Sequence, residues 1–182
     1  MKTKVINIYA GSGAGKSTLA AGLFFKMKKA GLNVELAREW VKSWAWSGRK
    51  ITELDQLHIS GQQSEVESSL YGKVDYVITD SPLLLSAIYD EFYNTSPIVL
   101  SVVQGFLARA KALGVHHVDF RLMRHKKFNP QGRYETEATA RAIDTFIDEK
   151  LPQWGITPIV VDKVSADEQV DFIFAAVVGE SI

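Results

Sequence analysis

Hydrophobic residues follow two alternating patterns along this chain. Short, nearly continuous apolar runs are typical of strands buried on both faces, and they occur at 5–9, 32–37, 74–79, 115–122 and 156–161. Between them, apolar residues recur every three or four positions, which predicts helices at 16–30, 55–70, 96–113, 135–151 and 165–177. A strand followed by a helix, five times over, requires right-handed crossovers and predicts an α/β fold with a parallel sheet covered on both faces.

Two helix starts are marked by a hydroxyl residue followed three positions later by an acidic one. Thr52 and Asp55 form such a pair, and so do Ser165 and Glu168. In this arrangement each side chain can bond the backbone of the other, which satisfies the first N–H groups of a helix. By contrast, segment 83–94 mixes apolar and aromatic residues and gives no clear prediction.

The helix predicted after Thr52 has two distinct faces. Leu57 is expected on its apolar side, together with Leu54, Val66 and Leu70. His58, Gln62 and Glu65 follow at spacings of four and three, so they share another face. We expect Gln62 and Glu65 to contact a substrate, whereas His58 fits a solvated face equally well.

A glycine-rich loop joins the first strand to the first helix, with the sequence Ala10-Gly11-Ser12-Gly13-Ala14-Gly15-Lys16-Ser17-Thr18. Such a loop turns its N–H groups toward a phosphate, the helix N-terminus adds partial positive charge, Lys16 reaches the outer phosphates and the Ser17 hydroxyl can bind Mg²⁺. This is a P-loop, with Ala10 where the stricter pattern has Gly. A nucleoside triphosphate is therefore expected to contact Gly11, Ser12, Gly13, Ala14, Gly15, Lys16, Ser17 and Thr18.

Charged residues follow the second and third strands directly. The carboxyl edge of a parallel sheet is where ligands bind in open α/β folds, and Arg38, Glu39 and Asp80 all fall there. Asp80 matches the Walker B arrangement, in which a carboxylate holds Mg²⁺ through water or orients the acceptor. The alternative is an Asp that only caps the next helix.

Three tryptophans, Trp40, Trp44 and Trp46, come close together after the second strand. We interpret them first as packing residues. The alternative is that one of them stacks on a substrate ring, because indole rings serve both purposes.

A basic segment follows the fourth strand. Residues 121–133 contain five Lys or Arg and no Asp or Glu, and Pro130 and Gly132 mark it as a loop. Phosphoryl transfer needs cations around the transferring group and a lid that excludes water, so we assign these roles to Arg124 and Arg133. The alternative is an exposed basic loop without a catalytic role. His116 and His117 lack the third ligand of a convincing metal site and are interpreted as structural.

Composition restricts the remaining possibilities. The 182 residues, 46% of them hydrophobic, suffice for one compact domain spanning 1–182. The formal net charge is zero, which indicates no overall attraction to nucleic acid or anionic membranes. The absence of cysteine excludes disulfides and thiol catalysis and fits a cytoplasmic location. No apolar run approaches the ~18 residues of a membrane helix, and no signal-peptide pattern precedes the first strand.

These motifs, in this order, resemble the nucleoside and nucleotide kinase branch of the P-loop proteins. More narrowly, Ala37-Arg38-Glu39-Trp40, the Gly61-Gln62 helix, Thr79-Asp80-Ser81-Pro82 and the lid from Phe128 to Tyr134 resemble the ribosylnicotinamide kinase domain of NadR and the small phage kinases related to it. The resemblance spans nearly the whole chain. It implies a five-stranded sheet in the order 2-3-1-4-5 with a lid at about 123–135.

The predicted function is Mg²⁺- and ATP-dependent phosphoryl transfer to a nucleoside, nucleotide or nucleoside-like acceptor. Lys16 and the loop would hold the phosphates, and Ser17 and Asp80 the metal. Glu39 would accept the proton of a hydroxyl acceptor, or would bind sugar or base beside a phosphate held by Arg38. Two alternatives remain: a phage-type kinase that phosphorylates a hydroxymethylated base in DNA, and an NTPase or nucleotide sensor without a small acceptor.

Overall fold

The computed structural model describes residues 2–52, 55–94 and 98–179. The described strands are β1 Thr3–Tyr9, β2 Val34–Ala37, β3 Tyr76–Thr79, β4 Val115–Leu122 and β5 Ile159–Val161. The described helices are α1 Lys16–Lys29, α2 Lys42–Ser47, α3 Asp55–Ser68, α4 Leu83–Asn94, α5 Ile98–Ala112, α6 Glu137–Gln153 and α7 Ala166–Val178.

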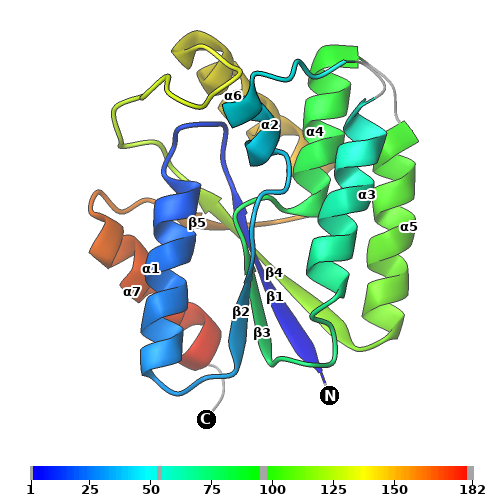
Figure 1. The fold of residues 1–182 in the computed structure, drawn as a ribbon. Coiled ribbons are helices and arrows are strands. Elements are labelled where there is room, and N and C mark those ends of the chain that lie inside the picture. The colour runs from blue at the N-terminus through cyan, green and yellow to red at the C-terminus, as the bar shows by residue number, and fades with distance from the viewer. Residues whose placement is uncertain (1, 53–54, 95–97, 180–182) are drawn as a thin grey trace.

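All five described strands form one parallel sheet in the order β2-β3-β1-β4-β5, as predicted. Helices α1 and α7 cover one face, and α3, α4, α5 and α6 cover the other (Figure 1). The carboxyl ends of the strands meet at the edge that carries α2 and the loop between β4 and α6 (Figure 1). The fold therefore brings the P-loop, the ends of β2 and β3 and the basic segment to one edge of the sheet.

The two faces of the sheet pack against different apolar cores. Ile6, Ile8 and Phe120 face α1 and α7, where Leu23 and Ile173 are fully buried. The opposite face meets α4, α5 and α6, whose buried residues include Leu84, Ile88, Val103, Ile143 and Ile147. Segment 83–94, which gave no clear prediction, is thus helix α4. This helix packs against α3, α5 and α6 and buries Ser86 and Asp90 along with its apolar residues.

Helix α3 buries only part of the face predicted for it, because Val66 and Leu70 pack against the core but Leu57 does not. Leu57 is 47% exposed, whereas Gln56, Ser60, Gln63 and Glu67 are buried with Ile59. Leu54, placed on the same predicted face, lies outside the described residues, as does residue 96, where the next helix was expected to begin. An apolar residue at an exposed position is common in proteins, but a buried polar row needs partners inside the fold.

One predicted capping pair forms in full and the other in part, because the Thr52 hydroxyl donates to Asp55 Oδ2 while the Asp55 N–H donates to the Thr52 backbone carbonyl. The backbone N–H of Thr52 donates to Asp55 Oδ2 over 2.8 Å, and Ser165 and Glu168 complete a reciprocal capping box at the start of α7. Among the described residues, no helix has the length and apolar character needed to cross a membrane.

Candidate active site

The P-loop is curled around the ammonium group of Lys16. Gly13 and Gly15 have φ values of 75° and 115°, a left-handed region that side chains other than glycine rarely adopt. Lys16 Nζ donates hydrogen bonds to the carbonyl oxygens of Ala10 at 2.7 Å and Gly11 at 3.2 Å. Helix α1 begins at Lys16, so its free N–H groups face the same concavity. This geometry is that of an anion-binding loop.

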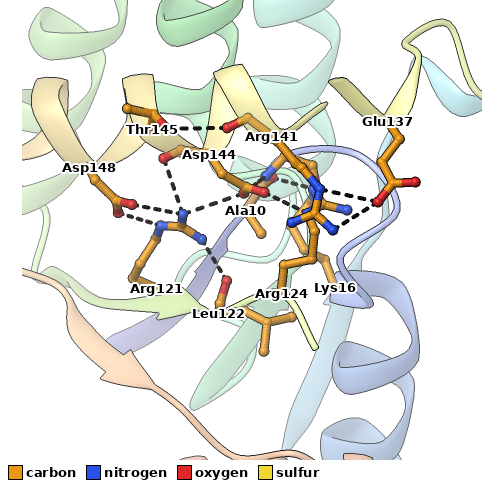
Figure 2. A network of polar contacts seen from close by, with 11 residues as sticks. Ala10, Lys16, Arg121, Leu122, Arg124, Glu137, Arg141, Asp144, Thr145 and Asp148 are labelled. Carbon is orange, nitrogen blue, oxygen red and sulfur yellow. Dashed lines mark hydrogen bonds and ion pairs between the residues drawn. The ribbon is translucent and has the colours of Figure 1, made fainter. Parts of the chain in front are cut away.

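An aspartate on α6 fastens the start of this loop. The N–H of Gly11 donates to Asp144 Oδ1 at 2.7 Å, and the other carboxylate oxygen accepts from Arg124 Nε, also at 2.7 Å (Figure 2). Arg124 Nη1 and Nη2 are buried and have no hydrogen-bond partner among the described residues. Two cationic NH2 groups are therefore available to an anion in the loop.

Glu39 and Asp80 lie beside Lys16, as the strand ends predicted. The N–H of Glu39 donates to Asp80 Oδ1 at 3.1 Å, which ties the end of β2 to the end of β3. Burial lowers the pKa of Lys16, although the charges of Glu39 and Asp80 counteract part of that shift. Burial likewise raises the pKa of Glu39, with Lys16 acting in the opposite direction. A carboxylate with a raised pKa is better suited to accept a proton near neutral pH.

The predicted metal-binding residues lie near the P-loop without forming a metal cage. Lys42 Nζ donates to Ser17 Oγ at 3.4 Å, and Asp80 is buried at the adjacent strand end. The described residues contain no group of three or more His, Asp or Glu placed to hold a metal ion. Mg²⁺ usually takes most of its ligands from phosphate oxygens and water, so the metal-binding roles of Ser17 and Asp80 stay predictions.

A cavity of about 510 Å³ opens directly beside the P-loop. Ser12, Lys16 and Glu39 line it, and the Ser12 hydroxyl is buried without a partner among the described residues. Its remaining walls come from the segment around α2, from α3, from α4 with the loop before it, and from the predicted lid. They are lined by Val41, Lys42, Ala45, Lys50, Ile51, Thr52, Gln56, Ile59, Ser81, Leu85, Ser86, Tyr89, Tyr93, Gly132, Arg133, Tyr134 and Glu135.

Three predicted acceptor contacts lie elsewhere. Arg38 and Glu65 are exposed, Gln62 is half-buried, and none of them lines this cavity. Helix α3 turns Gln56 and Ile59 toward the cavity instead, a consequence of the polar face that it buries. The substrate-binding roles of Arg38, Gln62 and Glu65 thus have no support from the cavity.

The lid lies over both the P-loop and α2. The Phe128 ring is so close to Gly13 that a Cβ there would come within 2.8 Å of it. The Tyr134 hydroxyl donates to the carbonyl oxygen of Arg49 at 2.7 Å. Arg133 lines the cavity and its Nε is buried without a partner among the described residues. The lid therefore places a cation in the wall that faces Glu39.

Trp40 and Trp44 pack against other rings in this structure, whereas Trp46 is 68% exposed. Trp44 stacks on His58, with ring centroids 5.8 Å apart, and Trp40 meets both rings edge-on. The Arg49 guanidinium lies 3.3 Å from the Trp44 ring centroid. His58, expected on a solvated face, is exposed but forms part of this stack.

The basic segment contains one residue that the sequence interpretation placed wrongly. Arg121 was counted with the anion-binding cations, but its side chain is 4% exposed and pairs with Asp148 at 2.6 Å and Asp144 at 3.4 Å (Figure 2). It joins β4 to α6 and is not free to bind phosphate. The sequence interpretation did not assign Asp144 to the site. A signal was present: Asp144 lies one helical turn before Asp148, on the helix that follows Arg121 and Arg124, so the two carboxylates share a face that could pair with these arginines.

The sequence matches a family model described as an AAA domain over residues 5–169. The chain belongs to the AAA domain family. The comparison with curated proteins gives no match.

Several solved structures share the fold of this AAA-domain chain at low sequence identity. NadR in complex with NAD and AMP-PNP has a TM-score of 0.70 at 12% identity, over 94% of this chain and 49% of that one. Deoxyadenosine kinase from M. mycoides has a TM-score of 0.62 at 18% identity, over 98% and 100% of the two chains. APS kinase CysC from Mycobacterium tuberculosis has a TM-score of 0.50 at 15% identity, over 95% of each chain.

These comparisons confirm the P-loop fold and the predicted likeness to NadR. This chain spans about half the length of the NadR chain. Identities this low establish the shared fold, so activity and acceptor follow only from the site itself.

Proposed function

We propose that this chain is a kinase that transfers the γ-phosphoryl group of ATP to a small nucleoside-type acceptor. The observation that carries the proposal is the shared cavity: Lys16 of the P-loop and Glu39 at the end of β2 line the same space of about 510 Å³. A donor phosphate on the loop and an acceptor in the cavity would thus meet at one point, which is what direct transfer requires.

The chain's residues account for each part of the transfer. P-loop N–H groups and Lys16 hold the β- and γ-phosphates, while Arg124 and Arg133 balance charge on the γ-oxygens. The acceptor hydroxyl oxygen bonds to the γ-phosphorus, the bond from that phosphorus to the β–γ bridging oxygen breaks, and ADP leaves. The hydroxyl proton passes to the Glu39 carboxylate. Mg²⁺ held by Ser17 and, through water, Asp80 would neutralise phosphate charge.

The walls of the cavity favour an acceptor with a planar ring and several polar groups. Tyr89, Leu85 and Ile59 supply apolar surface, and Gln56 and Ser86 supply hydrogen-bonding groups. A few polar groups in an otherwise apolar pocket are typical of small-molecule sites. A nucleoside or a nucleoside monophosphate has the matching chemistry.

The deciding experiment offers labelled ATP with a panel of acceptors: nucleosides, nucleoside monophosphates, ribosylnicotinamide and hydroxymethyl-containing DNA. Transfer to a small acceptor, abolished in the Lys16→Ala variant, is the expected result. Transfer only to DNA would replace the small acceptor by the modified base. Release of free phosphate without transfer to any acceptor would indicate an NTPase and overturn the proposal.

A further inference from the structure

The carboxylate of Asp144 makes contacts that connect three functional segments. Its Oδ1 accepts the N–H of Gly11 in the P-loop, and its Oδ2 accepts Nε of Arg124 at the base of the lid, both at 2.7 Å. Oδ1 also lies 3.4 Å from Nη2 of Arg121, and that Nη2 donates to the backbone carbonyl of Asp144 at 3.1 Å, which fixes this turn of α6 against β4 (Figure 2). Only 13% of the Asp144 side chain is exposed, so these bonds form in a weakly screened setting.

The bond to Nε determines where the rest of Arg124 can point. A guanidinium is planar and rigid, so an acceptor held on Nε fixes the plane of the group and with it the positions of Nη1 and Nη2. A Cβ placed on Gly11 would lie 3.1 Å from Nη2, and one placed on Gly13 would lie 3.6 Å from Nη1. The free edge of Arg124 therefore runs along the P-loop.

The guanidinium of Arg124 has few hydrogen-bond acceptors for a buried cation. Its side chain is 5% exposed, and Nη1 and Nη2 have no partner among the described residues. Leaving buried charged donors unpaired is costly, unless a ligand supplies the acceptors. Two adjacent oxygens of a phosphate match the spacing of the two free nitrogens.

We propose that Asp144 is a positioning residue that holds the free edge of Arg124 against the P-loop, ready to receive phosphate oxygens of the bound nucleotide. The inference rests on the proposed kinase function, because it assumes that the loop binds a nucleoside triphosphate. Asp144 itself touches neither nucleotide nor acceptor. It acts through Arg124 and through the amide of Gly11.

Calorimetric titration of the full chain with AMP-PNP and with adenosine tests this role. In Asp144→Asn the amide can still accept the Gly11 N–H, but it loses the charge that holds Arg124. We expect AMP-PNP to bind about tenfold more weakly and adenosine to bind unchanged. Asp148→Asn is the matched control, because Asp148 pairs with Arg121 on the same helix but does not contact Arg124 or the loop, and it should bind AMP-PNP like the wild type.

A double-mutant cycle separates positioning from a general structural effect. In an Arg124→Ala background, Asp144→Asn should cause no further loss of AMP-PNP affinity. An equal loss in both backgrounds would overturn the proposal. Should Asp144→Asn fail to fold, Arg124→Lys keeps the charge without the planar edge, and wild-type affinity in that variant would overturn it too.

The same titrations distinguish this inference from the proposed function. Absence of AMP-PNP binding by the wild-type chain would refute both. Normal binding by the wild type together with unchanged binding by Asp144→Asn and Arg124→Lys would refute only the role of Asp144.

Discussion

Lys16 and Glu39 have pKa values shifted toward each other by the same cause. Burial removes water from both groups, which lowers the pKa of the ammonium and raises that of the carboxyl. Each charge then partly restores the ionised form of the other. The pair remains close to the protonation states that phosphoryl transfer needs, a charged lysine for the phosphates and a proton-accepting glutamate for the hydroxyl.

Replacement of Glu39 by Gln tests the proposed proton acceptor. Turnover with a hydroxyl acceptor should fall about 10²-fold or more, while ATP affinity stays near the wild-type value. Because burial raises the Glu39 pKa, wild-type kcat/KM should decline as pH falls, starting above the ordinary range of a glutamate. Glu39→Gln should lack this decline, which pH profiles of steady-state rates would reveal.

Glu35→Gln is the control for that substitution. Glu35 lies on β2, the strand that leads to Glu39, but is 44% exposed and pairs with Lys28 on the surface. It should retain both the wild-type rate and the wild-type pH profile. Full activity in Glu39→Gln would remove Glu39 as the base.

At the scale of elements, the lid depends on contact with the segment around α2. Gly132 has a φ of 66°, and a Cβ there would lie 2.8 Å from the Trp46 ring. Gly132→Ala should therefore push the lid from Trp46 and raise the KM for the acceptor severalfold. Gly72→Ala is the matched control, because φ is 71° there and no atom lies within 4 Å of the added Cβ. Both variants place alanine in a left-handed backbone conformation, which costs about 1–2 kcal/mol of stability and can be measured by urea unfolding. If both raised the KM for the acceptor equally, the effect could not come from the contact between Gly132 and Trp46.

Arg133 is the lid residue expected to act in the transition state. Arg133→Ala should lower kcat more than it raises the KM for ATP, since charge on the γ-oxygens develops during transfer. Lys126→Ala, which removes an exposed cation from the same loop, should change neither constant appreciably. A rise in the KM for ATP with unchanged kcat would instead make Arg133 a ground-state binder.

Patterns in neighbouring residues predicted the positions of the helices and strands better than they predicted which helix residues are buried. The P-loop and the strand-end carboxylates follow from patterns confined to a few neighbouring residues, whereas the order of the sheet was predicted from the resemblance to P-loop kinases. Asp144 could not be assigned this way, because its partners Gly11 and Arg124 lie 133 and 20 positions away. Gln56 was missed for a related reason: only packing shows which face of α3 turns inward.

On the scale of the whole molecule, the sheet face opposite α1 contains polar groups within an otherwise apolar core. Glu67 on α3 is fully buried, and the Tyr71 hydroxyl donates a hydrogen bond to it. Burial raises the pKa of Glu67 to about 7; the Tyr71 hydrogen bond opposes that shift, and the nearby charge of Asp119 adds to it. At neutral pH the fold thus contains a carboxyl group that is only partly ionised.

This buried carboxyl should make the stability of the whole fold depend on pH. The folded-state pKa of about 7 lies above the ordinary value of 4.5, so the folded chain binds more protons than the unfolded chain between these values. The contribution of Glu67 to stability is therefore complete below the unfolded pKa and is lost as pH rises through the folded pKa.

Glu67→Gln keeps an oxygen that can accept the Tyr71 hydrogen bond but removes the charge. At about pH 8 the variant should be more stable than the wild type by ~3 kcal/mol, and near pH 4.5 most of this advantage should vanish, because Glu67 is then neutral in the folded chain. Urea unfolding at the two pH values measures the difference. Glu65→Gln changes an exposed residue on the same helix, and its stability relative to the wild type should not depend on pH in this way. A pH-independent difference between Glu67→Gln and the wild type would mean that Glu67 titrates alike in the folded and unfolded chains.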